Sequence, residues 1–549
     1  MRLFGLLLAL LYLLPLDSWA QLQDEKAYYF LYFKNKAQST YHLGAPSAFL
    51  SERALERRER QGIGVDETDL PVSESYIESL ENSGYAVVFS SKWLNGVCIG
   101  ISQNENIASL RQQFDFIAKS ERIKDPLGPG KRQDEHSKLP THAAAYGDSR
   151  LQLAQLNGTF LHQEGYFGTG KWIAVLDAGF FVADKVRGLK HLYEDGRFLG
   201  KRDFINPTSD LYSLHTHGTN VLSIMAAFSE GKLIGSAPLA NYLLIRTEDV
   251  DSEFPIEPYA WVAGAEWADS MGVDILNTSL GYTTFDNAAM DYSYEDLDGK
   301  STPISIAAGM AAEKGMLVVT AAGNYGGDRW QYIGAPADAL GGLSVGANDA
   351  DGERAWFSSR GPAADGRIKP EVMARGERTT HVFATDGDEV FQGNGTSYAA
   401  PIIAGLSACL WEAFPEVSAD LLRRTIIESS SQYRQPDSLM GFGMPDFRLA
   451  YEKLQVSTHS ESSLQLIRLF PNPMTHGSIQ LDLYTAESQR VEWTLMNATG
   501  QVVGEGFLAV TPQFSGRYHI DFPPLPIGAY VLQLSDGNER ITRKIINYP

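Results

Sequence analysis

Cysteine is almost absent from this chain of 549 residues: Cys98 and Cys409 stand alone and far apart. Two distant thiols exclude a disulfide framework and a cysteine-ligated zinc site. Basic residues are also under-represented, because 46 Lys and Arg face 67 Asp and Glu, giving a net charge of −21. Nucleic-acid phosphates attract a basic face, so we expect no nucleic-acid partner.

Long apolar runs are missing beyond the first twenty residues. Met1-Arg2 forms a short positive start, Leu3 to Leu14 is almost unbroken apolar sequence, and Ser18-Trp19-Ala20 supplies small residues. This pattern predicts a secretory signal peptide over residues 1–20. An N-terminal membrane anchor is the alternative, but spanning a bilayer needs about 20 apolar residues. We therefore expect the mature protein to work outside the cytoplasm.

The remaining sequence has ordinary globular composition, with 44% apolar and 21% charged residues, which excludes wholesale disorder. Its length predicts several domains. Strand-like Tyr28–Phe33 and Tyr85–Phe89 flank a charged helix around Arg53–Arg58, which favours a small α+β domain over residues 21–123. Residues 124–145 hold prolines, glycines and charges typical of a linker.

From residue 146 to 456 short apolar strands alternate with helical stretches. Trp172–Leu176 and Met316–Thr320 are predicted strands, and Thr219–Phe228 and Ala307–Gly315 predicted helices. Such alternation predicts an α/β fold with a parallel sheet covered by helices on both faces. Sites in such folds lie beyond the carboxyl ends of the strands.

The tail has a different periodicity. After a Ser-, Thr- and Gln-rich linker at 457–465, residues 466–549 show period-two strands such as Ser478–Leu483 and Tyr530–Leu534. This pattern predicts a C-terminal β-sandwich.

Three separated loops carry side chains suited to nucleophilic catalysis. Asp177 follows a predicted strand, and His217, beside Gly218, opens a helix. Ser397 lies within Gly395–Pro401, where a loop leads into the apolar helix Ile402–Phe414. Each has a simpler explanation: a turn aspartate, a structural histidine, or a serine N-cap. His215 is an alternative base that spacing does not exclude.

Together these residues supply one catalytic unit. A serine hydroxyl needs a base, and the base needs an orienting carboxylate. The order Asp, His, Ser is that of subtilisin, and the three motifs resemble those of the subtilisin-like serine proteases, the subtilases. The resemblance covers about residues 146–455 and includes Phe357–Pro362 and Lys369–Val372.

Further roles follow from this resemblance. It implies that Asn324 completes the oxyanion hole, since an amide donates a hydrogen bond without adding charge. Two segments are implied to bind substrate: Ser279, Leu280 and Gly281, within a strand that pairs with it, and Ala321, Ala322 and Gly323 opposite.

The flanking domains have counterparts too. In subtilases a domain such as 21–123 is a propeptide that assists folding and inhibits the enzyme until it is exported. In the tail, Leu469–Pro473, Gly528–Leu532 and Arg540–Lys544 resemble the C-terminal sorting domain of the type IX secretion system. We therefore expect a protein secreted by, or held on the surface of, a Gram-negative bacterium.

The expected function is that of a secreted serine endopeptidase working through an acyl-enzyme. Its expected partners are polypeptide substrates, its own propeptide and the outer-membrane secretion machinery, and we expect a monomer. No cofactor is needed for this chemistry; Tyr294–Gly299 could hold a structural calcium, although its spacing favours a plain acidic turn. The alternatives are a catalytically silent surface binding protein on the same scaffold, and an α/β-hydrolase esterase, which requires a different residue order.

Overall fold

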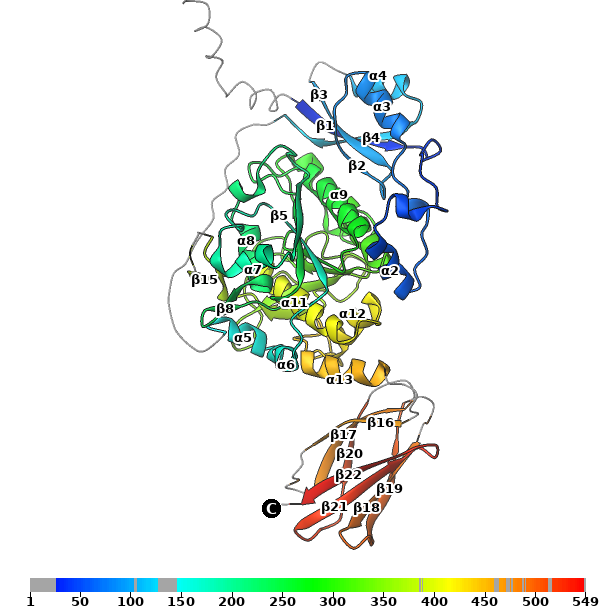
Figure 1. The fold of residues 1–549 in the computed structure, drawn as a ribbon, viewed down its shortest axis with the longest axis vertical. Helices are drawn as coiled ribbons and strands as arrows, with labels where there is room; N and C mark the ends of the chain where they lie inside the picture. Colours follow the sequence, from blue (N-terminus) through cyan, green and yellow to red (C-terminus); the bar gives the residue numbers. More distant parts are fainter. Residues whose placement is uncertain are drawn as a thin grey trace, which may run out of the picture. The chain divides into compact units, whose positions relative to one another are not determined.

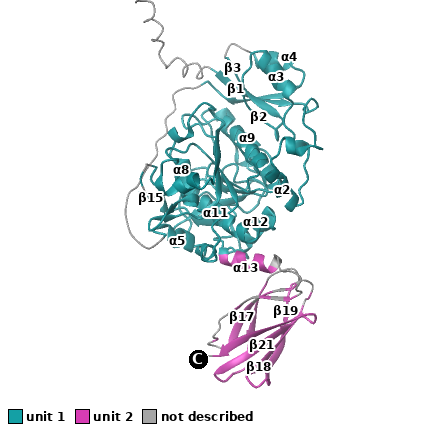
Figure 2. Ribbon diagram, in the orientation of Figure 1, with its two compact units in different colours: residues 1–447 teal, residues 448–549 magenta. Residues whose placement is uncertain are grey.

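The computed structural model describes residues 26–547, apart from 103–105, 127–145, 385–386, 388, 459–463, 471–473, 475–476, 486–487, 489 and 512–515. The predicted signal peptide and all but the first three residues of the linker 124–145 lie outside these described residues. The chain forms two compact units, residues 1–447 and 448–549 (Figure 2).

The N-terminal domain, described over 26–126, is built on a four-stranded antiparallel sheet of order β2-β3-β1-β4. Its strands are β1 Lys26–Phe33, β2 Val87–Ser91, β3 Gly96–Ser102 and β4 Ile117–Lys124. Side chains alternate across the sheet. Leu31 therefore packs under helices α3 (Glu74–Asn82) and α4 (Ile107–Gln113), while Phe30 packs against the next domain. Both predicted strands exist, the second beginning at Val87, and the predicted charged helix is α2 (Glu52–Arg60).

The larger domain contains a seven-stranded sheet of order β13-β12-β11-β10-β5-β9-β6, parallel throughout. Figure 1 labels β5 within this domain. This confirms the predicted α/β fold. The strands are β5 Trp172–Asp177, β6 Phe198–Asp203, β9 Asn241–Arg246, β10 Ile275–Thr278, β11 Leu317–Ala321, β12 Leu343–Asn348 and β13 Val372–Arg375.

Helices cover both faces of this sheet. On one face α9 (Ile256–Met271) and α10 (Pro303–Glu313) share a core with residues such as Leu176, Leu276 and Val318. On the other face α8 (His217–Ala226) packs against β5, and α11 (Thr396–Ala413) lies under β10 to β13. The strands are buried on both sides, which explains their nearly continuous apolar sequences.

Several predicted element bounds need correction. Helix α8 begins at His217 and ends before Phe228, which belongs to the short strand β7 (Phe228–Ser229). Helix α11 begins at Thr396 rather than Ile402, so Ser397 lies inside its first turn. Strand β10 ends at Thr278, and Ser279–Gly281 lie beyond it.

The second unit contains two antiparallel sheets. One consists of β16 (Leu464–Phe470), β17 (Ser478–Thr485) and β20 (Gly516–Asp521). The other consists of β18 (Arg490–Asn497), β19 (Val502–Ala509), β21 (Gly528–Ser535) and β22 (Arg540–Asn547). Leu481 and Leu532, from different sheets, share one buried core, so the predicted β-sandwich is confirmed. Helix α13 (Phe447–Thr458) includes the start of the predicted linker 457–465, and β16 includes its end.

Among the described residues, no helix combines the length and the apolar character required to cross a bilayer.

Candidate active site

The predicted site residues gather at one edge of the parallel sheet. Strands β11, β10 and β5 are neighbours, and their carboxyl ends lie at the same edge. Asp177 ends β5, Ser279 follows β10, and Ala321 ends β11 three residues before Asn324. The topology thus brings together side chains separated by almost 150 residues in sequence.

Asp177 and His217 are in direct contact. The His217 Nδ1 atom lies 2.9 Å from Oδ1 and 3.0 Å from Oδ2 of Asp177. The carboxylate is fully buried, and the imidazole is 25% exposed. A carboxylate accepts hydrogen bonds, so this contact favours the tautomer with the proton on Nδ1 and leaves Nε2 as the basic nitrogen.

Gly218 makes that contact sterically feasible. A Cβ atom at this position would lie 2.4 Å from the backbone oxygen of Gly179 and 3.0 Å from Cβ of Asp177. The start of α8 therefore lies against the turn after β5 only because residue 218 has no side chain. The expectation that glycine lets another segment approach the histidine is met.

His215, the alternative base, has a different position. Its Nδ1 accepts a hydrogen bond from the backbone N–H of His217 at 3.3 Å, and the two rings are 6.4 Å apart. Asp177 contacts His217, and this pairing distinguishes the two histidines.

Ser397 is positioned by an exchange of hydrogen bonds with Ser279. Proline lacks an N–H, so Pro401 cannot donate to the carbonyl four residues earlier in α11, which belongs to Ser397. The Ser279 hydroxyl donates to that carbonyl instead, at 2.8 Å. In return the Ser397 hydroxyl donates to the Ser279 carbonyl at 3.2 Å. Pro401 thus lies beyond the first turn, contrary to the prediction, and Ser279 supplies the missing donor.

The Ser397 hydroxyl therefore contacts Ser279 rather than the imidazole, which is nevertheless close by. Helix α11 packs against α8, whose first residue is His217. The ring of Tyr398, the next residue after Ser397, lies 5.9 Å from the His217 ring.

Asn324 contacts the residue that precedes Ser397. Its Oδ1 accepts hydrogen bonds from the backbone N–H (2.9 Å) and hydroxyl (3.0 Å) of Thr396, which fixes the orientation of the amide. A Cβ on Gly395 would lie 3.6 Å from Nδ2 of Asn324 and 3.7 Å from the backbone nitrogen of Ser397. Two nitrogen donors therefore flank the same small space.

Each of the two predicted substrate-binding segments contacts the start of α11. Ser279 is nearly buried and Leu280 half-buried, and the Gly281 carbonyl accepts a hydrogen bond from the Tyr325 hydroxyl at 3.0 Å. Ala321 and Ala322 are buried in the sheet edge. The Gly323 N–H donates to the Thr396 hydroxyl at 3.1 Å, which ties this wall to the start of α11.

The acidic segment Tyr294–Gly299 forms a turn whose carboxylates contact neighbouring backbone. Asp296 accepts from the N–H and hydroxyl of Ser293, and Asp298 accepts from the N–H groups of Lys300 and Ser301. The described part of the chain holds no cluster of three or more His, Cys, Asp and Glu side chains suited to a metal.

Sequence reasoning missed an aromatic cavity beside the site. Its walls include Trp356, Phe383, Phe391 and Tyr398. One signal of this cavity was available in the sequence: Trp356 directly precedes the motif Phe357–Pro362, which resembles a subtilase motif. Strands β14 (Thr379–Val382) and β15 (Val390–Gly393) form a hairpin that no sequence motif marks. Phe383 directly follows β14, and Phe391 lies in β15.

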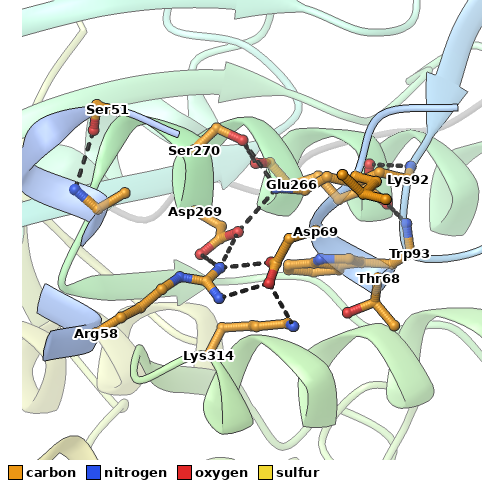
Figure 3. A network of polar contacts seen from close by, with 12 residues as sticks. Ser51, Arg58, Thr68, Asp69, Lys92, Trp93, Glu266, Asp269, Ser270 and Lys314 are labelled. Atoms are coloured by element: carbon orange, nitrogen blue, oxygen red, sulfur yellow. Dashed lines mark hydrogen bonds and ion pairs between the residues drawn. The ribbon is translucent and has the colours of Figure 1, made fainter. Parts of the chain in front are cut away.

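The N-terminal domain is anchored to the larger one by a buried network of charges (Figure 3). On α9, Asp269 accepts hydrogen bonds from Arg57 (2.5 Å), Arg58 (2.9 Å) and Lys92 (3.0 Å), all from the N-terminal domain. A further contact has the charges reversed between the domains: Lys314, which directly follows α10 in the larger domain, donates to Asp69 of the N-terminal domain at 3.1 Å.

Nearby, Glu266 accepts the backbone N–H groups of Lys92 (2.8 Å) and Trp93 (3.0 Å). Burial raises the pKa of Glu266, with hydrogen bonds acting against it. Burial would also raise the pKa of Asp269, but the positive charges of its three cationic neighbours outweigh burial and lower it.

Known proteins resemble this chain over the domain that holds the parallel sheet. The model of the subtilase family, Peptidase S8, matches residues 168–443. The thermostable alkaline protease of Halalkalibacterium halodurans is 30% identical over 293 residues, covering 53% of this chain and 70% of that protein. The chain belongs to the subtilase family. Subtilisin E of Bacillus subtilis is 27% identical to this subtilase over 361 residues, covering 63% of this chain and 84% of that protein.

The flanking domains of this subtilase match two further families. Residues 28–138 match the Peptidase S8 propeptide domain of Bacteroidota, and residues 468–547 match the secretion system C-terminal sorting domain. Among solved structures, the crystal structure of MycP1 from the ESX-1 type VII secretion system is similar, with a TM-score of 0.46, 20% identity, and coverage of 59% of this chain and 91% of that one.

The predicted resemblance is thereby confirmed in all three parts. The protein is a subtilisin-like serine peptidase with a propeptide domain. Its sorting domain implies export to the medium or the cell surface.

Proposed function

We propose that this subtilase is a secreted endopeptidase in which Ser397 is the nucleophile, His217 the general base and Asp177 the residue that orients the base. The observation that carries this proposal is the pair of contacts at 2.9 and 3.0 Å between the buried Asp177 carboxylate and Nδ1 of His217. A buried carboxylate on one imidazole nitrogen fixes the tautomer that can accept a proton at the other.

The first half of the reaction forms an ester. A rotation about the Cα–Cβ bond of Ser397 turns its hydroxyl from the Ser279 carbonyl toward Nε2 of His217. The serine oxygen then attacks the peptide carbonyl while its proton passes to the imidazole. The amide of Asn324 and the backbone N–H of Ser397 donate to the oxyanion. Collapse breaks the C–N bond, and the imidazolium gives its proton to the departing amine.

The second half releases the acyl group. Water loses a proton to His217 and adds to the ester carbonyl, and the Ser397 oxygen leaves with the returned proton. Ser279–Gly281 and Ala321–Gly323 hold the acyl side of the substrate, as the resemblance implies. No cofactor takes part in these steps, and a calcium ion at Tyr294–Gly299 would be structural.

The propeptide acts as an intramolecular inhibitor, because tethering gives it a high effective concentration at the catalytic domain. The tail engages the outer-membrane secretion machinery, and an N-terminal signal peptide begins the export. We propose that the processed enzyme acts as a monomer on polypeptide substrates.

Casein hydrolysis by the processed protein tests the proposal. We expect Ser397→Ala and His217→Ala each to lower kcat by at least about 10⁴-fold, and the double variant to be no worse than either, because the residues act as one unit. His215→Ala is the matched control and should retain activity within a few-fold. A wild-type protein that binds casein without cleaving it would instead support the silent binding protein, which the Asp177–His217 contact and the protease relatives disfavour.

A further inference from the structure

The cavity beside the site is large. It has a volume of about 830 Å³, and none of the described residues that line it is Asp, Glu, Lys or Arg. Among the described residues, six Phe, Trp and Tyr rings and the His381 imidazole contribute to its walls; the six are Phe181, Trp356, Phe357, Phe383, Phe391 and Tyr398.

Unusually exposed apolar side chains gather here. Trp356 is 71% exposed, and Phe383 and Phe181 are 39% and 38% exposed. The rings of Phe383 and Phe391 lie 4.4 Å apart, and those of Trp356 and Phe357 lie 5.8 Å apart. Exposed apolar clusters of this kind on a soluble domain mark binding surfaces.

The position of the cavity assigns it to one side of the cleaved bond. In the proposed reaction His217 gives its proton to the departing amine, so the departing peptide lies next to the imidazole. Thr216, which directly precedes α8, and Asn220, within its first turn, line the cavity, and so does Tyr398, whose ring lies 5.9 Å from the His217 ring. Asn324, the proposed oxyanion donor, also lines the cavity, which therefore extends to the cleaved bond itself. The two segments implied to hold the acyl side, 279–281 and 321–323, contribute no described lining residue.

We propose that this cavity binds a large apolar side chain, preferentially an aromatic one, from the part of the substrate that follows the cleaved bond. The proposal rests on the proposed function and adds a substrate preference to it. A pocket walled by aromatic rings gains from burying an aromatic ring and from edge-to-face contacts. A carboxylate there would lose its hydration, and none of the described lining residues is a lysine or arginine that would pair with it.

Internally quenched peptides test this preference. The peptides share one sequence up to the cleaved bond and carry Phe, Leu, Gly or Asp at each of the first three positions after it. We expect one position at which kcat/KM for Phe exceeds that for Gly by about 10–100-fold, the discrimination that an apolar pocket can provide. Asp at that position should be the poorest substrate.

Variants then locate the preference. Trp356 is largely exposed, so Trp356→Ala should fold, and we expect it to reduce the Phe-to-Gly ratio by about tenfold. Phe391→Ala should act in the same direction. Phe228→Ala is the matched control: this ring is 52% exposed on β7, outside the cavity, and its removal should leave the ratio unchanged.

A peptide methyl ester with the same acyl part separates the two proposals, because it places no residue after the cleaved bond. We expect Trp356→Ala to weaken Phe-peptide cleavage about tenfold more than ester hydrolysis. If the ester is hydrolysed but the peptides show no preference at the three positions, this inference alone is overturned. The same holds if Trp356→Ala slows hydrolysis of the ester and of every peptide equally. Failure to hydrolyse both ester and peptides would overturn the proposed function and this inference with it.

Discussion

Loss of the Asp269 charge should release helix α2 from the catalytic domain. The perturbation is Asp269→Asn, made in full-length protein that also carries Ser397→Ala, so that the proposed peptidase activity does not interfere. The carboxylate is fully buried and accepts hydrogen bonds from Arg57, Arg58 and Lys92. Asparagine preserves the volume but removes the negative charge that all three cations share.

The magnitude follows from the burial of the partners. Arg57 and Arg58 are each 1% exposed, so water does not compensate their charge in the closed state. Removing one partner of such a buried pair costs about 3–5 kcal/mol. This corresponds to an increase of about 10²-fold to several thousand-fold in the fraction of molecules in which α2 is detached.

Trypsin provides the assay, because it cleaves after arginine and both arginines are inaccessible until α2 detaches. We expect cleavage after Arg57 and Arg58, mapped by mass spectrometry, to be faster by about that factor in the variant. Asp420→Asn is the matched control, since Asp420 forms exposed pairs with Arg423 and Arg424. Such exposed pairs contribute about 1 kcal/mol or less, so the control rate should change little.

An unchanged tryptic rate in a folded Asp269→Asn variant would refute this account of the anchor. If the variant failed to fold, Arg57→Met would test the same contact from the propeptide side, with Arg58 as the remaining cleavage site. An unchanged rate in that variant as well would show that the charges do not hold the two domains together.

Three further predictions concern the active site and the anchor. Asn324→Ala should lower kcat by about 10²–10³-fold with little change in KM, measured on a peptide substrate, because one oxyanion donor is lost; equal losses in kcat and gains in KM would contradict that role. Gly218→Ala should lower kcat/KM by about 10²-fold, since a Cβ 2.4 Å from a backbone oxygen displaces the start of α8; Gly342→Ala, where the nearest atom is 3.6 Å away, is the control. The pKa of Asp269 is lowered in the folded protein, so its carboxylate stabilises the anchor fully above the unfolded pKa near 3.9, and this stabilisation is lost as the pH falls further. The pKa of Glu266 is raised, so its ionisation at higher pH destabilises the anchor instead. Hydrogen exchange of the α2 amides, corrected for intrinsic rates, should therefore show protection that does not fall between about pH 7 and 5 but falls below about pH 4; loss of protection near pH 6 would contradict the assignment.

Local patterns were sufficient to predict most of the fold. Trp172–Leu176 is apolar throughout because β5 is buried on both faces, and that burial is visible in the sequence. The N-terminal bounds of α11 were harder to predict. Thr396 and Ser397 carry polar side chains typical of a cap, and the sequence does not show that Ser279, 118 residues away, replaces the hydrogen bond that Pro401 cannot make.

Contacts between residues that are far apart in the sequence could not be predicted from local patterns. Asp269 meets its three cations across more than 170 residues, and Arg57 and Arg58 looked like an ordinary charged helix surface. The aromatic cavity has the same origin, since Phe181, Trp356 and Phe391 approach one another only in the folded chain. The proposed catalytic residues could be named from the sequence because each lies in a motif with a recognisable local sequence.

The most direct test of the central claim is the site of reaction with a serine-directed fluorophosphonate probe. Mass spectrometry of the processed protease should place the label on the peptide that contains Ser397, with labelling lost in Ser397→Ala and strongly slowed in His217→Ala. Labelling of a different serine, or undiminished labelling of Ser397→Ala, would contradict the account.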